Sequence, residues 1–138
     1  MTAKEYLGQA KRLDNIIKCR LQELEYWRGL SGSLSSCGFG QTRSSNRPSE
    51  APFVKCIERI DGIEREIDNK IDELVRLREE IGKAIDTVEG RDEQLVLHYR
   101  YLDDLSWTDI ANKLFVSERT ARRIHETALK NFNVPSKS

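Results

Sequence analysis

Apolar residues recur at helical spacing through the middle of the chain. Between residues 53 and 89 they stand three or four positions apart, the period of a helix with one apolar face. They are Phe53, Ile57, Ile60, Ile63, Ile67, Ile71, Leu74, Leu77, Ile81, Ile85 and Val88. No proline lies between Phe53 and Val134, and charged residues fill most other positions. The pattern predicts one long, coiled-coil-like helix.

The N-terminal stretch repeats this pattern, and we expect its helix to end near Gly29. The apolar positions are Leu7, Ala10, Leu13, Ile16, Ile17, Leu21, Leu24 and Trp27. Between the two helices, twelve of the 22 residues in 31–52 are Ser, Gly or Pro, which predicts a flexible linker. The two helices most simply form an antiparallel hairpin over residues 1–90. Either apolar stripe can also serve a second copy, so we expect a homodimer.

After Gly90 the pattern predicts shorter helices in a second domain, residues 91–138. The first covers residues 91–102, and we expect its inward positions to be Leu95, Val96, Tyr99 and Leu102. Asp103 and Asp104 then make a turn. Ser106 and Ser117 are suited to cap two further helices, because their hydroxyls can accept from the first N–H groups of a helix. The fold class is therefore all-α.

The two last helices are spaced like a helix-turn-helix, in which the second helix enters the DNA major groove. Ala111 is small enough for the helix contact, and we expect Ala121, Ile124, Ala128 and Phe132 to be buried. The residues then left for double-stranded DNA are Lys113, Ser117, Glu118, Arg119, Thr120, Arg122, Arg123, Glu126 and Lys130. An arginine guanidinium can donate to O6 and N7 of guanine together, so Arg119 and Arg122 are the first choices for contacts with base edges.

Three of these side chains are better suited to phosphates than to bases, namely Arg123, Lys113 and Lys130. Glu118 either accepts from a cytosine amine or only favours the N-terminus of its own helix. The distribution of charge along the chain also favours a DNA site in its C-terminal part. The whole chain is neutral, but residues 112–138 hold six basic and two acidic residues. Phosphate binding depends on such a local patch.

Composition narrows the classes of function. There is no long apolar run for a membrane span and no signal-peptide pattern, so we expect a cytoplasmic protein at the nucleoid of a bacterial host. Cys19, Cys37 and Cys56 are too widely spaced for a zinc site or a disulfide framework. Neither histidine has a ligand or nucleophile partner at useful spacing. We expect no enzyme activity, no metal and no cofactor.

Residues 105–111 (Leu-Ser-Trp-Thr-Asp-Ile-Ala) and 116–125 (Val-Ser-Glu-Arg-Thr-Ala-Arg-Arg-Ile-His) resemble region 4 of the sigma-70 family. That resemblance covers residues 91–132 and implies binding to promoter DNA. Two positions depart from it: Phe115 stands at a turn position usually held by Gly, and Ala121 replaces a bulkier residue. The chain has no segment like the sigma region that melts DNA, so we do not expect a complete sigma factor.

Residues 3–10 and 67–81, with the helix-turn-helix, resemble a family of small phage and prophage proteins that includes late transcriptional regulators of the ArpU type. This resemblance implies a sequence-specific transcriptional regulator of phage or prophage genes. Two alternatives stay open. One is an adaptor that binds RNA polymerase through a region 4-like fold, and the other is a DNA-packaging recognition subunit. The sequence decides neither the DNA target nor activation versus repression.

Overall fold

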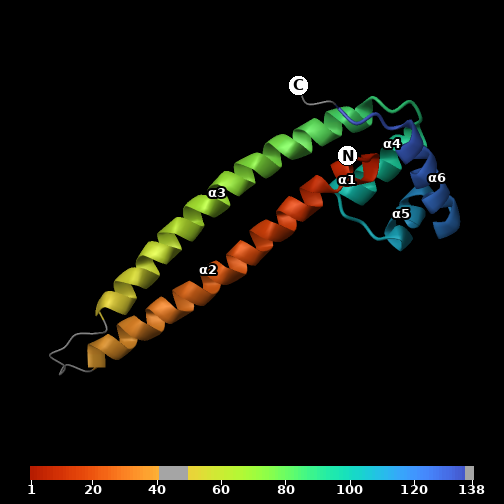
Figure 1. The fold of residues 1–138 in the computed structure, drawn as a ribbon. Coiled ribbons are helices and arrows are strands. Elements are labelled where there is room, and N and C mark those ends of the chain that lie inside the picture. Colours follow the sequence, from red (N-terminus) through yellow and green to blue (C-terminus); the bar gives the residue numbers. More distant parts are fainter. Residues whose placement is uncertain (41–49, 136–138) are drawn as a thin grey trace. The chain divides into compact units, whose positions relative to one another are not determined.

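The computed structural model describes residues 1–40 and 50–135, with side chains for 1–34 and 51–135. Helices dominate this part of the chain, and no strand occurs within it, so the all-α prediction is confirmed. Figure 1 shows the elements in order. They are α1 (Ala3–Leu7), α2 (Gln9–Gly40), α3 (Glu50–Asp86), α4 (Arg91–Leu97), the π-helical η1 (His98–Leu102), α5 (Trp107–Leu114) and α6 (Glu118–Asn131).

The contacts divide the chain into two compact units. Unit 1 comprises residues 1–14 and 73–138, and unit 2 comprises residues 15–72. Sequence patterns had placed a boundary at residue 90, between a hairpin domain and a C-terminal domain. The packing differs from that prediction, because the start of the chain and the end of α3 share a core with the C-terminal helices.

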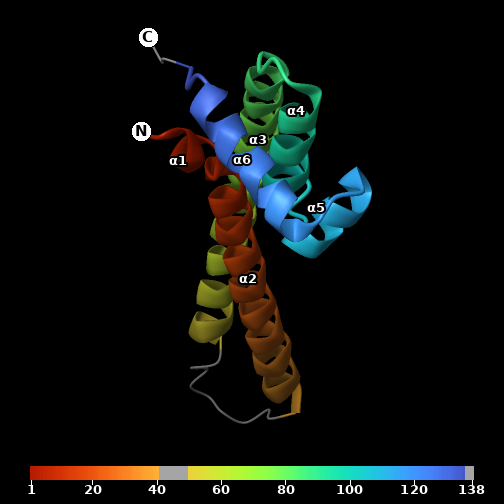
Figure 2. The same cartoon turned by 90° about the vertical axis from the view of Figure 1, so that its right-hand side faces the viewer.

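Unit 2 consists of two helical segments, from α2 and α3, that run side by side in opposite directions (Figures 1 and 2). Buried residues follow a seven-residue repeat on α2, where Ile17, Leu24 and Ser31 are each at most 9% exposed. On α3, Cys56 and Ile63 are buried with the same separation. A seven-residue repeat keeps one seam of each helix facing its partner, as in a coiled coil. The long α3 helix predicted for residues 53–89 is confirmed, and it lies at Glu50–Asp86.

The linker predicted for residues 31–52 needs correction. The α2 helix does not stop near Gly29 but continues to Gly40, and α3 already begins at Glu50. Serine and glycine weaken a helix by less than about 1 kcal/mol each, which tertiary packing can offset. Ser31, the first residue of the predicted linker, is buried. The rest of that linker, residues 41–49, lies outside the described residues.

Unit 1 encloses two neighbouring hydrophobic clusters. The larger joins α1, the end of α3, α4 and α6, and it contains Tyr6, Leu7, Ala10, Ile81, Ala84, Ile85, Val88, Leu97, Leu102, Ala128 and Phe132. The smaller contains Val96, Ile110, Ala111 and Ala121, and so joins α4, α5 and α6. The Tyr6 hydroxyl donates to Oε1 of Glu80 at 3.1 Å, which ties α1 to α3. These clusters hold α5 and α6 in place.

One inward residue of the helix over 91–102 was predicted wrongly. Leu95 is 39% exposed, whereas Leu97 is fully buried beside Val96. Val96 and Leu102 do face inward, and Tyr99 packs on the smaller cluster. The helix widens into a π-helical turn after Leu97, where the Asp103 N–H donates to the carbonyl of His98 at 3.0 Å. This wider turn shifts which side chains face the core.

Candidate nucleic-acid interface

Helices α5 and α6 both begin at a serine cap. The hydroxyl of Ser106 accepts from the Asp109 N–H, and that of Ser117 accepts from the Thr120 N–H, each at 3.2 Å. Ser117 also donates to the Thr120 hydroxyl at 3.0 Å. Both predicted caps are confirmed. The remaining N–H groups of the first turn of α6 give this end of the helix a positive electrostatic potential.

The turn between α5 and α6 ends α5 with a left-handed residue. Phe115 has φ 59° and ψ 41°, and the N–H of Val116 donates to the carbonyl of Ala111 at 3.0 Å. The Phe115 N–H reaches the carbonyl of Asn112 at 3.3 Å, which completes the Schellman arrangement. Glycine is the usual residue there because a Cβ is strained at positive φ. The Phe115 side chain is 93% exposed, so no packing compensates for the strain.

Small residues let α5 and α6 approach each other closely. Ala111 on α5 is 4% exposed and Ala121 on α6 is fully buried, both in the smaller cluster. The face of α6 predicted to be inward is confirmed. Ala121, Ala128 and Phe132 are buried, and Ile124 is half-buried against the smaller cluster. Burial of this face leaves the opposite side of α6 in solvent.

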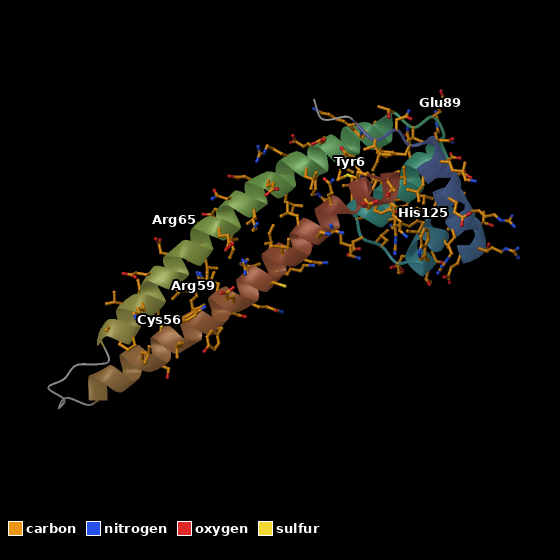
Figure 3. The ribbon with its side chains drawn as sticks, in the orientation of Figure 1. Tyr6, Cys56, Arg59, Arg65, Glu89 and His125 are labelled. Carbon is orange, nitrogen blue, oxygen red and sulfur yellow. The ribbon has the colours of Figure 1, made fainter. Side chains whose placement is uncertain are left out.

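His125 adds a polar group to the buried face of α6 that sequence patterns did not place there. Figure 3 labels His125 on α6. Its Nε2 lies 2.7 Å from the Tyr101 hydroxyl, and the two rings are stacked with centroids 5.6 Å apart. The ring of Trp107 meets His125 edge-on at 5.0 Å. These contacts join η1, α5 and α6 beneath the exposed side of α6.

Burial, together with the positive charge of Arg100, lowers the pKa of His125 to about 4. The imidazole is therefore neutral near pH 7, and its Nε2 can accept a hydrogen bond from the Tyr101 hydroxyl. Burial also raises the pKa of the Tyr101 hydroxyl, which keeps that group protonated. The pair therefore joins an uncharged donor to an uncharged acceptor, which a partly buried site tolerates better than a charge.

Two arginines lie against the ring of Trp107. The Cζ atom of Arg100 is 4.9 Å from the ring centroid, and that of Arg122 is 5.4 Å from it. Arg100 also donates to the carbonyl of Leu105 at 3.1 Å. Such cation–π contacts contribute about 0.5–1 kcal/mol each at exposed sites. Trp107 also packs on the smaller cluster.

All nine residues predicted to contact DNA are exposed. Most lie on α6, where Arg119, Arg123, Glu126 and Lys130 follow one another at steps of four, three and four, which places them along one side of the helix. We call these four residues the α6 stripe. Lys113 stands apart near the end of α5, with Nζ 5.8 Å from the ring centroid of Tyr99.

Besides Lys113 and Thr120, three more of the nine have contacts within the protein that bear on their role. Glu118 accepts from the hydroxyl of Thr108 at 3.2 Å, which connects the start of α6 to α5. Ser117 caps the helix and Arg122 lies on Trp107. Arg119 and Arg123, by contrast, are exposed on the α6 stripe, so they have most room to reach a ligand.

Sequence reasoning missed the side chains that support this surface. Arg100, Tyr101 and His125 were assigned no contact with the residues predicted to bind DNA, yet they form the cluster that holds Trp107 and, through it, Arg122. Tyr99, Tyr101 and Trp107 lie close together in the sequence, and this group of aromatic residues could have indicated the cluster. In the part of the chain that the structure describes, no group of three or more His, Cys, Asp or Glu side chains could hold a metal ion.

The fold and this surface define an all-helical protein with a capped helix that presents a mainly basic stripe. Residues 6–133 match the family described as Protein of unknown function (DUF722), and the chain belongs to that family. No match was found among curated proteins or among solved structures. Within residues 1–40 and 50–135, no helix is long and apolar enough to cross a membrane.

Proposed function

We propose that this protein is a non-enzymatic, sequence-specific regulator of transcription that binds double-stranded DNA through α6. The observation that carries the proposal is the α6 stripe, in which three of four exposed side chains are basic, on a helix whose opposite face is buried. A helix of this kind, with its first N–H groups available to phosphates, suits the major groove.

In this proposal, α5 and α6 form a helix-turn-helix, and the antiparallel helices of unit 2 form the hairpin of the predicted fold. Two features support the first part: the Schellman turn at Phe115, and the contact of Ala111 and Ala121 between the two helices. The resemblance of residues 91–132 to sigma-70 region 4 supports a promoter as the target. The resemblance to ArpU-type proteins supports phage or prophage genes in a bacterial cytoplasm.

The structure refines the choice of base-reading residues. Arg122 lies on Trp107, so its guanidinium is already held, whereas Arg119 and Arg123 lie on the α6 stripe. We therefore propose that Arg119 and Arg123 make the main contacts with DNA and that Arg122 is a positioned neighbour. Lys130 and Lys113 contribute phosphate contacts in this proposal.

The test is a selection of bound fragments from bacterial and resident phage DNA by the purified full-length protein. The best fragment is then titrated by fluorescence anisotropy with Arg119→Gln/Arg123→Gln. Loss of base contacts is expected to raise the Kd at least about 10-fold, since each good contact contributes about 1–3 kcal/mol. The matched control, Arg76→Gln/Lys83→Gln, removes two exposed charges from α3 and should bind like the parent. Failure to enrich any fragment would refute the proposal.

An RNA polymerase-binding adaptor remains a second candidate because of Phe115. The Phe115 ring is 93% exposed on a strained turn, and a protein partner that covered it would remove this apolar surface from water. In that case Phe115→Ala would abolish retention by immobilised RNA polymerase and leave fragment selection unchanged. A DNA-packaging subunit would assemble into a larger ring, so the mass of the protein in solution separates that alternative from a dimeric regulator.

A further inference from the structure

Arg100 and Arg122 share the ring of Trp107 on one flank of α6. Arg100 comes from η1 and is half-buried, whereas Arg122 comes from α6 itself and is exposed. Arg122 precedes His125 by three positions, which places the two residues about 60° apart around α6. Because His125 is on the buried face, this flank lies between the buried face and the α6 stripe.

The short helix α1 packs beside α6 and carries an exposed cation. Figure 2 shows α1 next to α6, and the rings of Tyr6 and Phe132 lie 5.8 Å apart where the two segments meet. A capping box between Thr2 and Glu5 stabilises the start of α1. Lys4 lies two positions before the buried Tyr6, about 200° around the helix, and its side chain is exposed. The core contact of α1 therefore holds Lys4 in solvent near α6.

The imidazole of His125 shows which charges lie near this flank. Its pKa is lowered chiefly by burial, and then by the positive charges of Arg100 and Lys4. A charge has such an effect only when it lies near the titrating group. Glu126 raises the pKa, but its effect is the smallest of the four. Lys4 therefore lies on the same side of α6 as Arg100.

We call Lys4, Arg100 and Arg122 the flank cluster. They come from three separate elements, and among the side chains that the structure describes none of them is in an ion pair. Lys11, by contrast, pairs with Asp104 at 2.8 Å. Positive charges that gather without acidic partners repel one another, and an anion that binds among them relieves this repulsion.

The position of the flank cluster indicates which anion it suits. A helix is about 10–12 Å across and the major groove is about 12 Å wide, so a helix that reads the groove has a phosphate strand along each flank. The flank cluster lies along one such side of α6, next to the stripe that faces the bases in the proposed complex. Lysine and arginine side chains placed there would meet backbone phosphates.

We propose that α1 is part of the DNA-binding surface, and that Lys4 binds backbone phosphate together with Arg100 and Arg122 on one flank of α6. This inference rests on the proposed function and extends it to the start of the chain. The flank cluster contacts one strand, and the base edges are left to the α6 stripe. Lys4 therefore contributes affinity and salt dependence but no sequence preference.

The test is fluorescence anisotropy of the full-length protein on the selected fragment over a series of salt concentrations. Lys4→Gln should raise the Kd about 5-fold near 0.1 M salt and lower the slope of log Kd against log salt by about one. Lys4→Arg keeps the charge and should bind like the parent. The matched control is Lys83→Gln, which removes an exposed lysine from α3 in the same unit. Thermal unfolding followed by circular dichroism checks that each variant stays folded.

A second measurement locates the contact on the DNA itself. Single phosphates of the fragment are replaced in turn by uncharged methylphosphonate, and each duplex is titrated with the parent and with Lys4→Gln. At the phosphate that Lys4 binds, the replacement should weaken the parent but not Lys4→Gln, because the variant has already lost that contact. At other contacted phosphates both proteins should lose affinity equally.

The outcomes separate this inference from the proposed function. If the parent binds a fragment specifically and Arg119→Gln/Arg123→Gln weakens it, but Lys4→Gln has the Kd and salt slope of the parent, α1 is outside the DNA contact and only this inference fails. Equal losses for parent and Lys4→Gln at every methylphosphonate would also overturn it. A parent that binds no fragment would overturn both.

Discussion

The guanidinium of Arg122 on α6 lies 5.4 Å from the centre of the Trp107 ring on α5. This contact joins the exposed side of one helix to the start of the other. It also explains how a side chain next to the α6 stripe can be held in place without an ion pair. Arg100 contacts the same ring, so Trp107 is a shared site for two cations.

A double-mutant cycle between Arg122→Ala and Trp107→Phe measures this contact. We expect a coupling of about 0.5–1 kcal/mol in the free energy of unfolding, the usual value for an exposed cation–π pair. Urea denaturation followed by circular dichroism gives the four free energies. The control cycle pairs Trp107→Phe with Arg123→Ala, which is exposed on the α6 stripe, and it should show no coupling. Equal coupling in both cycles would contradict the assignment.

Phe115→Gly should stabilise the protein. The left-handed conformation at φ 59° costs a residue with a Cβ about 1–2 kcal/mol, and glycine avoids most of this despite its larger entropy in the unfolded chain. We expect a net gain of about 1 kcal/mol, measured as a rise in the urea midpoint. Phe115→Ala is the matched control: it removes the exposed ring but keeps the Cβ, so its stability should equal that of the parent. A less stable glycine variant would refute the strain argument.

Acidification should destabilise the folded chain through His125. Its pKa falls from 6.5 to about 4 on folding, chiefly because it is buried. Between these values the unfolded chain binds a proton that the folded chain does not, so stability decreases as the pH falls from 6.5. The slope from this group is at most about 1.4 kcal/mol per pH unit, and it vanishes above pH 6.5.

The check is the free energy of unfolding at pH 7, 6 and 5. His125→Gln should flatten this dependence, since glutamine cannot bind a proton there, although the variant is less stable at every pH. The control is Thr127→Gln, which changes an exposed residue of α6 without adding or removing a titratable group and should keep the parent slope. An unchanged slope in His125→Gln would show that other groups dominate the acid sensitivity.

Lys130→Gln should weaken DNA binding without altering sequence preference. A lysine at this end of the α6 stripe contacts phosphate in the proposed complex, so the slope of log Kd against log salt should decrease by about one. Anisotropy titrations at four salt concentrations on two different fragments give both quantities. Lys83→Gln, an exposed lysine on α3, should leave the slope as it is in the parent. A change in preference between fragments would assign Lys130 to a base instead.

The sequence predicted the features that depend on local spacing. The long run of apolar residues at helical spacing predicted α3 to within three residues at each end. The caps at Ser106 and Ser117 were predicted because each serine stands just before a further helical pattern. The resemblance to sigma-70 region 4 placed Phe115 at a turn position usually held by glycine, and φ there is 59°. Each of these signals is contained in a few neighbouring residues.

Features that depend on packing between distant segments were not predictable. Ser31 is buried in unit 2, and α2 continues through a stretch rich in serine and glycine. The π-helical turn after Leu97 changed which residues face the core, so Leu97 is buried where Leu95 had been expected. The contact of Arg122 with Trp107 also depends on how α5 and α6 cross. Spacing along one helix gives no information on such contacts.

The contact between α5 and α6 has a consequence for how related proteins can diverge. Ala111 and Ala121 are almost completely enclosed, so any larger side chain there would separate the helices and rotate α6. Arg119 and Arg123 have no such restriction, because they stand in solvent. Under the proposed function, we therefore expect target preference to change by exchange of the outward residues while the packing of α5 on α6 is retained, so that one scaffold can acquire many specificities through single substitutions.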